Sequence, residues 1–252
     1  MNKIARLILA SGESSPDMRY AAGFSTPDEF LYFSTDRERG VICSPLEFSR
    51  AVAQTRDGVT VHAEAEFGGP DRLEMLTRLA ASLGVAGYLV PSDFPVLWAD
   101  KLRGRGLEMR VESGVFFPQR EFKSAAEVEA VVRSQRAGEA GLRRAVEVLR
   151  ESEITPDRLI RWRGKLLTSE ILRSEIDVAM VRLGMLPTGT ICAGGEQAAQ
   201  PHNTGSGPLR ADWPIVMDIF PRSAETGYWG DLTRTVVKGR ASELVRRAYD
   251  AV

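Results

Sequence analysis

Two aspartates, Asp218 and Asp231, are the residues of this sequence whose type and spacing best suit chemistry. They lie in two segments, residues 215–220 and 228–237, that are rich in β-branched and aromatic side chains. The segment between them, residues 222–227, is polar, ends in glycine and has the composition of a turn. This pattern predicts a β-hairpin with one aspartate on each arm.

The position of the hairpin loop decides how the two aspartates meet. A four-residue loop at residues 223–226 pairs Phe220 with Trp229 and places Asp218 directly opposite Asp231, about 4.5 to 5.5 Å away at Cβ. Two ionised carboxylates at that separation, among apolar side chains, either share a proton or hold a cation between them. The cation is the sharper hypothesis. The alternative is that both are solvated residues near a turn, where acidic side chains are common.

The residues around the two aspartates resemble a known motif. Asp218, the Gly-Tyr pair at residues 227–228 and the run Gly-Asp-Leu-Thr-Arg-Thr-Val at residues 230–236 resemble the first metal-ligand motif of the pita-bread peptidases. That family includes methionine aminopeptidase, aminopeptidase P and prolidase. Upstream, the sequence Pro-His-Asn around His202 resembles the substrate-side histidine segment of the same family.

The resemblance implies a role for each of these residues. Asp218 and Asp231 would be metal ligands, with Asp231 bridging two divalent ions and Asp218 holding one of them. Manganese is favoured, by the resemblance and by the oxygen-rich ligands, and cobalt or zinc are the alternatives. His202 would be a catalytic residue that contacts the substrate, and Tyr228 and Thr233 would bind the substrate.

The spacing around Asp218 departs from the family pattern. Relatives have Asp-x-Gly at this aspartate, whereas Asp218 is followed by Ile-Phe-Pro, which puts the bulky Phe220 near the expected site. The gap to Asp231 is also two residues longer than usual. Two added residues keep both carboxylates on one face of a sheet, because strand side chains alternate with a period of two.

The family's other metal ligands, a histidine and two glutamates, have no counterpart here. Both histidines, His62 and His202, precede Asp218. The sequence ends at Val252, within a helical pattern at residues 242–249 that has no C-terminal cap. We therefore expect a C-terminally truncated peptidase whose full-length form binds two divalent ions. The fragment itself should bind metal weakly or not at all and should be inactive.

Residues 1–122 have the pattern of an α/β domain, because candidate strands and helices alternate. The segment at residues 15–24, Ser-Pro-Asp-Met-Arg-Tyr-Ala-Ala-Gly-Phe, resembles the opening of the creatinase-type N-terminal domain. The predicted strands are residues 30–33, 39–43, 59–63, 87–90 and 107–111, and the predicted helices are residues 45–54, 70–83 and 94–103.

Residues 123–252 form the second predicted domain. Ser124 and Glu127 have the spacing of a capping box at the start of a long helix that reaches about residue 151. Further helices are predicted to begin at Thr155 and Thr168, and a strand at residues 189–195. Together with the resemblance, the fold class is α/β: a creatinase-type N-terminal α/β domain followed by an incomplete pita-bread α+β catalytic domain.

The first domain contains a second group of residues with metal-binding chemistry. His62, Glu64 and Glu66 alternate along the sequence, so a strand through them would place all three on one face. The solvated polar face of an edge strand is the favoured alternative.

The composition indicates the broad class of protein. The chain has 252 residues, 43% of them hydrophobic, and a net charge of −1, which indicates a soluble globular protein without a bias toward nucleic acid or membranes. Cys43 and Cys192 are too few for a disulfide framework, which favours a reducing, cytoplasmic compartment. The N-terminal apolar run is too short for a membrane span and poorly suited to a signal peptide. We expect a peptide substrate and assembly as a homodimer.

Three functions are compatible with these residues. The leading hypothesis is a metal-dependent exopeptidase of the Xaa-Pro aminopeptidase or prolidase type, which hydrolyses the N-terminal bond of peptides with proline after the scissile bond. The alternatives are a non-catalytic peptide- or protein-binding module on the pita-bread fold and a creatinase-like C–N hydrolase. The presence of both Asp218 and Asp231 argues against the two alternatives.

Overall fold

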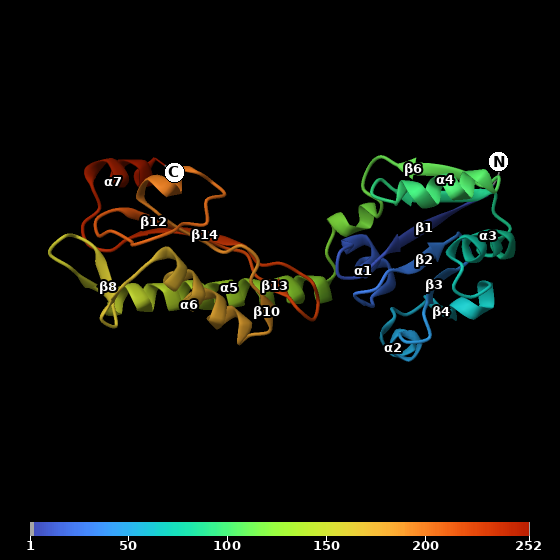
Figure 1. Ribbon diagram of the computed structural model, residues 1–252, viewed down its shortest axis with the longest axis horizontal. Helices are drawn as coiled ribbons and strands as arrows, with labels where there is room; N and C mark the ends of the chain where they lie inside the picture. Colours follow the sequence, from blue (N-terminus) through green and yellow to red (C-terminus); the bar gives the residue numbers. More distant parts are fainter. Residues whose placement is uncertain (1–2, 252) are drawn as a thin grey trace. The chain divides into compact units, whose positions relative to one another are not determined.

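A computed structural model of the protein describes residues 3–251. The chain divides into two compact units, Met1–Phe122 and Lys123–Val252 (Figure 1). No sheet within the described residues includes strands from both units. Each unit is described by itself below.

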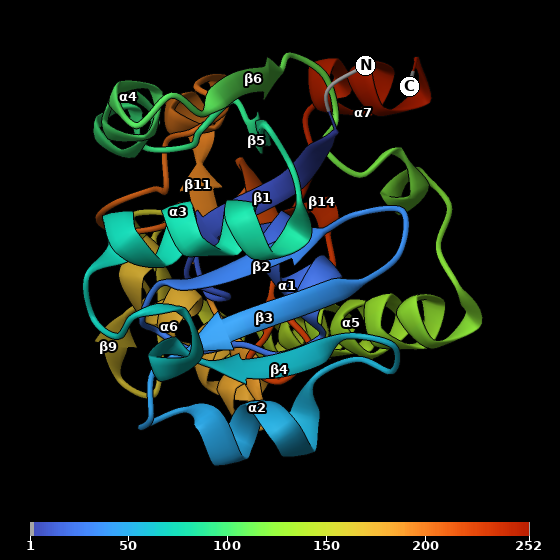
Figure 2. The same ribbon diagram turned by 90° about the vertical axis from the view of Figure 1, so that its right-hand side faces the viewer.

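The first unit is built on one mixed six-stranded sheet with the order β4-β3-β2-β1-β5-β6, which runs from bottom to top in Figure 2. Strand β1 is central, pairing antiparallel with β2 and parallel with β5. In chain order the elements are β1 (Ile4–Ala10), α1 (Pro16–Ala22), β2 (Phe30–Ser34), β3 (Arg39–Cys43), α2 (Phe48–Gln54), β4 (Thr60–Ala63), η1 (Glu64–Phe67), α3 (Arg72–Leu83), β5 (Gly87–Pro91), α4 (Val96–Gly104), β6 (Glu108–Glu112) and η2 (Pro118–Glu121).

Helices bury both faces of this sheet. On one face α3 and α4 pack on side chains such as Leu7 and Tyr88, and Figure 2 shows α3 crossing in front of the strands. The buried Tyr88 hydroxyl donates to the Leu76 carbonyl at 2.7 Å, so this phenol is paired inside the core. On the other face α1 and α2 contribute Met18 and Ala51 to a separate core cluster.

Most strands and helices predicted for this unit lie where the sequence patterns indicated, within a few residues at each end. The apolar run Ile4–Ala10, considered only as a membrane or signal segment, is the central strand β1. The shared strand face predicted for His62, Glu64 and Glu66 is wrong, because β4 ends at Ala63 and the chain turns into η1. Glu66 instead folds back to accept hydrogen bonds from the Ala63 amide at 2.7 Å and to pair with His62 Nδ1 at 2.9 Å.

The second unit places two helices against a three-stranded antiparallel sheet of order β11-β12-β14. In chain order its elements are α5 (Ala125–Glu151), β7 (Glu153–Ile154), β8 (Ile160–Trp162), β9 (Lys165–Leu166), α6 (Ser169–Val181), β10 (Met185–Leu186), β11 (Ile191–Gly194), η3 (Gly195–Ala199), β12 (Pro214–Ile219), β13 (Arg222–Ser223), β14 (Leu232–Val237) and α7 (Glu243–Asp250).

The long helix α5 packs against both α6 and the sheet of this unit. Its predicted capping box is confirmed, since Ser124 Oγ accepts from the Glu127 amide and the Glu127 carboxylate accepts from the Ser124 amide. Two mid-helix glycines allow close packing: a Cβ at Gly138 would lie 2.6 Å from Leu232 Cδ2, and one at Gly141 would lie 2.9 Å from Ile176 Cγ2. Helix α5 therefore contacts β14 and α6 at distances that larger residues would not permit.

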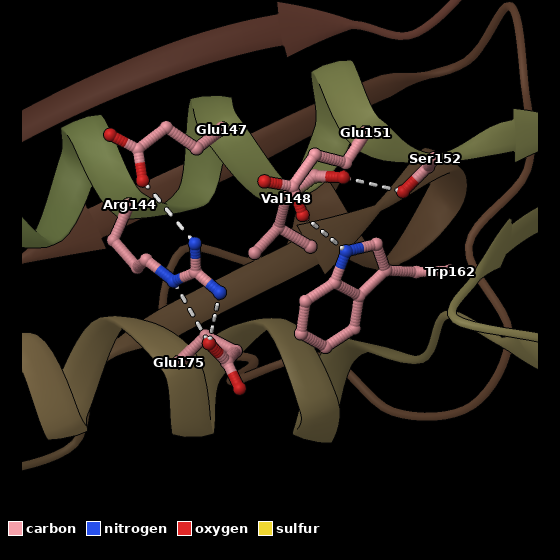
Figure 3. Close-up of polar contacts among 7 residues, drawn as sticks. All are labelled: Arg144, Glu147, Val148, Glu151, Ser152, Trp162 and Glu175. Carbon is pink, nitrogen blue, oxygen red and sulfur yellow. Dashed lines mark hydrogen bonds and ion pairs between the residues drawn. The ribbon is translucent and has the colours of Figure 1, made fainter.

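A polar clamp also joins α5 to α6 (Figure 3). The Arg144 guanidinium donates to Glu175 Oε2 through Nε at 2.9 Å and Nη2 at 2.7 Å, and it pairs with Glu147 at 3.3 Å. These carboxylates raise the pKa of Arg144, chiefly through the Glu175 hydrogen bonds. Its guanidinium carbon lies 5.7 Å from the ring centroid of Trp162, whose indole N–H donates to Glu151. The clamp fixes the two helices and β8 together.

The helix predicted to begin at Thr155 is wrong. The Thr155 hydroxyl donates to Asp157 and accepts from the Leu159 amide at 3.0 Å, and Arg158 has a left-handed φ of 64°. These local bonds make a tight turn between β7 and β8, because Thr and Asp side chains compete with helical backbone bonds. The helix predicted at Thr168 is confirmed as α6, which this threonine caps.

No helix in the described part of the chain combines the length and apolarity that a bilayer-spanning segment needs.

Candidate functional site

The sheet β11-β12-β14 has one buried face and one open face. Along β12, Ile215, Met217 and Ile219 are fully buried and join the core cluster that includes α5 and α6. Val216 and Asp218 alternate with them and are only half-buried, so they point to the opposite, open face. The apolar alternation of β12 thus fixes the direction of the Asp218 carboxylate.

The predicted pairing of Asp218 with Asp231 is wrong by two residues. Asp218 lies opposite Thr233, and Ile219 lies opposite Leu232. The same register continues beyond the strand ends, where Arg222 pairs with Trp229. The predicted pair of Phe220 with Trp229 is therefore also wrong.

Gly227 explains the shift in register. This residue has a left-handed φ of 73°, so it belongs to the turn and not to the strand arm. Its amide donates to the Ser223 carbonyl at 2.9 Å, and Ser223 Oγ accepts from the Thr226 amide. The four-residue loop therefore spans residues 224–227, one residue later than predicted, and each one-residue shift of the loop changes the partner number by two.

Both aspartates nevertheless lie on the open face. Gly230 packs against α5, since a Cβ there would lie 2.5 Å from the carbonyl carbon of Ser134. The Gly230 amide also donates to the Pro221 carbonyl at 2.9 Å, which keeps the ladder in register. The residues next to Gly230, Trp229 and Asp231, consequently point away from α5. Asp231 stands diagonally across from Asp218, at a typical Cβ separation of about 7–8 Å.

The two carboxylates have different surroundings. Asp218 is half-buried, lies between Ile191 and Thr233 in the register, and accepts a hydrogen bond of 2.6 Å from Thr233 Oγ1. Asp231 is exposed, and its backbone amide donates to Gln135 Oε1 of α5 at 3.0 Å. The Asp218 side chain is therefore oriented by a neighbour, and the Asp231 backbone is held by the helix beneath it.

His202 lies in an exposed loop between η3 and β12. This loop runs beside β11, because the Cys192 amide donates to the Thr204 carbonyl at 3.1 Å. Arg173 of α6 donates to the same carbonyl at 2.6 Å and holds the loop in place. The loop, β11, β12 and β14 follow one another across the sheet, so two strands separate the histidine loop from β14.

Tyr228 and Thr233 have their hydroxyl groups engaged within the protein. The half-buried Tyr228 donates through its hydroxyl to Glu127 at the start of α5, and its carbonyl accepts from Ser134 Oγ at 2.9 Å. Thr233 is exposed and donates to Asp218. In this arrangement Tyr228 anchors the hairpin to α5, and Thr233 supports the Asp218 carboxylate.

The side chains on the open face decide whether divalent metal ions fit there. Carboxylate oxygens suit hard divalent ions, and Asp218 and Asp231 share one face. Within residues 3–251, however, no cluster of three or more histidine, cysteine, aspartate or glutamate side chains is arranged to hold a metal ion. The described residues thus fit part of a metal site and do not complete one.

Helix α5 makes contacts with this region that the sequence patterns did not predict. Glu127, Ser134 and Gln135 bind the hairpin segment that carries Tyr228 and Asp231. The partners are more than 90 residues apart in the chain, and a polar side chain on a helix gives no signal of which distant partner it will meet. The one sequence signal for this group is the helical period of α5, which puts Glu127, Ser134 and Gln135 near one side of the helix.

Several solved structures share this fold. The prolidase from Pyrococcus furiosus is 18% identical, with a TM-score of 0.77 over 99% of this chain and 66% of that chain. The X-Pro aminopeptidase from Thermotoga maritima is 17% identical, with a TM-score of 0.80 over 99% and 67%. The Xaa-Pro dipeptidase from Bacillus anthracis is 17% identical, with a TM-score of 0.79 over 98% and 64%. This chain spans about two thirds of the length of these proteins.

A sequence comparison identifies the second unit. The model of metallopeptidase family M24 matches residues 129–252, the segment that contains His202, Asp218 and Asp231. No curated protein sequence matches the chain significantly. The expected fold class, an α/β unit followed by part of a pita-bread α+β domain, is confirmed by these matches. Residues 129–252 are therefore similar in sequence to metallopeptidase family M24.

Proposed function

We propose that this chain is part of a metal-dependent exopeptidase of the Xaa-Pro aminopeptidase or prolidase type, which hydrolyses the N-terminal bond of peptides with proline after the scissile bond. The observation that carries the proposal is the placement of Asp218 and Asp231 on the open face of β12 and β14. Support comes from the M24 match and from solved neighbours that are described as prolidase and X-Pro aminopeptidase.

In this proposal the aspartates are two ligands of a site for two divalent ions. Manganese is the preferred metal, with cobalt or zinc as alternatives, because the donors are carboxylates. Bound divalent ions would supply activation of the attacking water and Lewis-acid polarisation of the peptide carbonyl. Asp218 is oriented for a ligand role by the hydrogen bond from Thr233. The missing ligands would come from polypeptide equivalent to the third of the solved relatives that this chain does not match.

The chain's other candidate residues would act on the substrate. His202 is exposed on a loop held by Arg173, so its imidazole is free to contact a peptide carbonyl or the developing oxyanion. Tyr228 and Thr233 would border the substrate. The O–H of Thr233 donates to Asp218, and the lone pairs of the same hydroxyl oxygen can accept from a peptide N–H.

The first unit would be a creatinase-type N-terminal domain. Its mixed sheet with helices on both faces is compatible with that assignment. We propose a cytoplasmic, homodimeric enzyme, with dimerisation tested by sedimentation velocity.

The test compares the 252-residue protein with an extended form that includes any coding sequence found after residue 252. Mn²⁺ is added in small amounts to ¹⁵N-labelled 252-residue protein, and paramagnetic broadening of amide signals locates the ion. We expect weak binding that broadens the signals of Asp218, Asp231 and Thr233 first, because two carboxylates leave most of the coordination to water. Turnover of an Xaa-Pro dipeptide is expected only in the extended form.

Charge-removing variants supply the controls. Asp218→Asn and Asp231→Asn should each abolish the local broadening and, in the extended form, the turnover. Asp36→Asn, in an exposed turn of the first unit, removes one carboxylate charge outside the M24-like unit and should change neither. Broadening that persists in the double variant Asp218→Asn/Asp231→Asn would show that this face is not the metal site.

A further inference from the structure

Three consecutive residue pairs line the open face of the hairpin. They are Asp218 with Thr233, Phe220 with Asp231, and Arg222 with Trp229, as the register of the ladder requires. The pairs between and beside them are the hydrogen-bonded ones: the Gly230 amide donates to the Pro221 carbonyl, and the Ser223 amide donates to the Tyr228 carbonyl. The three open-face pairs are therefore of the non-hydrogen-bonded kind, whose side chains approach most closely.

Phe220 occupies the position between the two carboxylates. It is two residues from Asp218 on one strand and directly across from Asp231 on the other. Its ring extends over Gly189, where a Cβ would lie 3.7 Å from Phe220 Cζ. Phe220 is half-buried, and its place in the ladder is next to both aspartates.

Trp229 continues the aromatic surface toward the hairpin loop. Its side chain is 47% exposed, although Trp is a residue that proteins usually bury. The guanidinium carbon of Arg222 lies 6.0 Å from the ring centroid, a cation–π distance that restrains the indole. An exposed but restrained indole next to Phe220 is an apolar surface with little conformational entropy left to lose on binding.

We infer that Phe220 and Trp229 form an apolar wall beside Asp218 and Asp231, and that this wall binds the apolar side chain of a peptide at the site. The inference rests on the proposed function for the identity of the ligand. A peptide that binds at the carboxylate pair and runs along the hairpin places a neighbouring side chain at the two rings, because they are the next residues on the same face. Peptides with a branched apolar residue should therefore bind more tightly than peptides with glycine at that position.

The test uses the ¹⁵N-labelled 252-residue protein without metal, titrated with the dipeptides Leu-Pro and Gly-Pro. We expect Leu-Pro to bind roughly tenfold more tightly, since burying part of a leucine side chain contributes on that scale. The shifts should centre on the Trp229 indole N–H and on the amides of residues 218–222. Phe220→Ala and Trp229→Ala should each reduce the ratio of the two dissociation constants toward one.

Matched variants separate loss of the wall from loss of the fold. Phe220→Leu keeps an apolar cover over Gly189 and should retain most of the preference. Phe122→Ala removes a phenylalanine that is 79% exposed, and Trp98→Ala removes a first-unit indole, so neither should change the ratio. Thermal unfolding of each variant verifies that its second unit is folded.

The outcomes distinguish this inference from the proposed function. An equal affinity for both dipeptides, or a Leu-Pro preference that survives Phe220→Ala and Trp229→Ala, overturns the wall even if Mn²⁺ binds at the aspartates. A preference that these variants abolish supports it even if the extended protein neither binds Mn²⁺ nor hydrolyses peptides, and in that case the proposed function fails alone.

Discussion

The Thr233 hydroxyl donates a hydrogen bond of 2.6 Å to the carboxylate of Asp218, the residue directly opposite it in the antiparallel ladder. The contact occupies one carboxylate oxygen and orients the other. It also replaces the facing pair of aspartates that the sequence pattern indicated. Asp231 thereby becomes the diagonal neighbour of Asp218, which relieves the repulsion between two carboxylates in direct opposition.

Thr233→Val should weaken metal binding at this face. The valine keeps the shape and removes the donor, so the Asp218 carboxylate loses one orienting hydrogen bond, which contributes about 1 kcal/mol, or roughly fivefold in affinity. Mn²⁺ binding to the extended protein by calorimetry measures the change. Thr233→Ser keeps the hydroxyl and should bind like the wild type, and equal loss in both variants would show that the threonine methyl group matters instead.

Gly230→Ala should destabilise the second unit. The new methyl group would lie 2.5 Å from the Ser134 carbonyl carbon and 2.6 Å from the Gln135 nitrogen, and backbone atoms of a helix cannot yield. We expect the free energy of unfolding to fall by about 1–3 kcal/mol, measured by urea denaturation. Gly104→Ala is the control, because a Cβ there meets nothing within 4 Å and the residue ends a helix. Similar losses in both variants would contradict the packing argument.

Arg144→Ala should loosen the contact between α5 and α6. Its bonds to Glu175 join side chains that are 24% and 31% exposed, so solvent screens them only in part. We expect a loss of about 1 kcal/mol in the free energy of unfolding, with part of it due to lost packing on Trp162. A double-mutant cycle with Glu175→Ala should give a coupling of about 0.5–1 kcal/mol. The exposed Arg143→Ala should cost little, and a vanishing coupling would mean that solvent screens the pair completely.

Asp177 should make the second unit less stable as the pH rises. Burial raises the pKa of this carboxyl, against the opposing effects of the 2.6 Å hydrogen bond from Thr190 and of the Arg173 charge. Because the folded state holds the proton more tightly than the unfolded state, this contribution to stability is lost as the pH rises through the interval between the two pKa values. Asp177→Asn cannot ionise and should remove that loss, so the stability of the variant relative to the wild type should grow as the pH rises above the ordinary pKa of an aspartate.

Asp157 supplies a control of opposite sign. The hydrogen bond from Thr155 lowers the pKa of Asp157, so its contribution is present at neutral pH and is lost as the pH falls through the lowered value. Asp157→Asn should therefore be less stable than the wild type at neutral pH and approach it in acid. Urea denaturation at a series of pH values measures both variants. The same sign for both would refute the assignment of the Asp177 shift to burial.

The elements that the sequence determined are those specified within a few residues. The Ser124 and Glu127 capping box begins α5, and Thr168 caps α6. The apolar alternation of β12 decides which way Asp218 points, because only one face of the strand can be buried. The same alternation leaves Asp218 and Asp231 on one face under any even shift of register.

The tertiary structure decided the pairing. Thr155 is followed by Pro156, a residue that suits the first turn of a helix. The Thr155 side chain nevertheless closes a turn around Arg158. The register of the hairpin depends on the left-handed backbone of Gly227 and on Gly230 packing against Ser134, contacts that no local propensity encodes. Caps and alternation act over about four residues, whereas register and helix docking are set by close approach between segments about 90 residues apart, and only the folded chain brings those segments together.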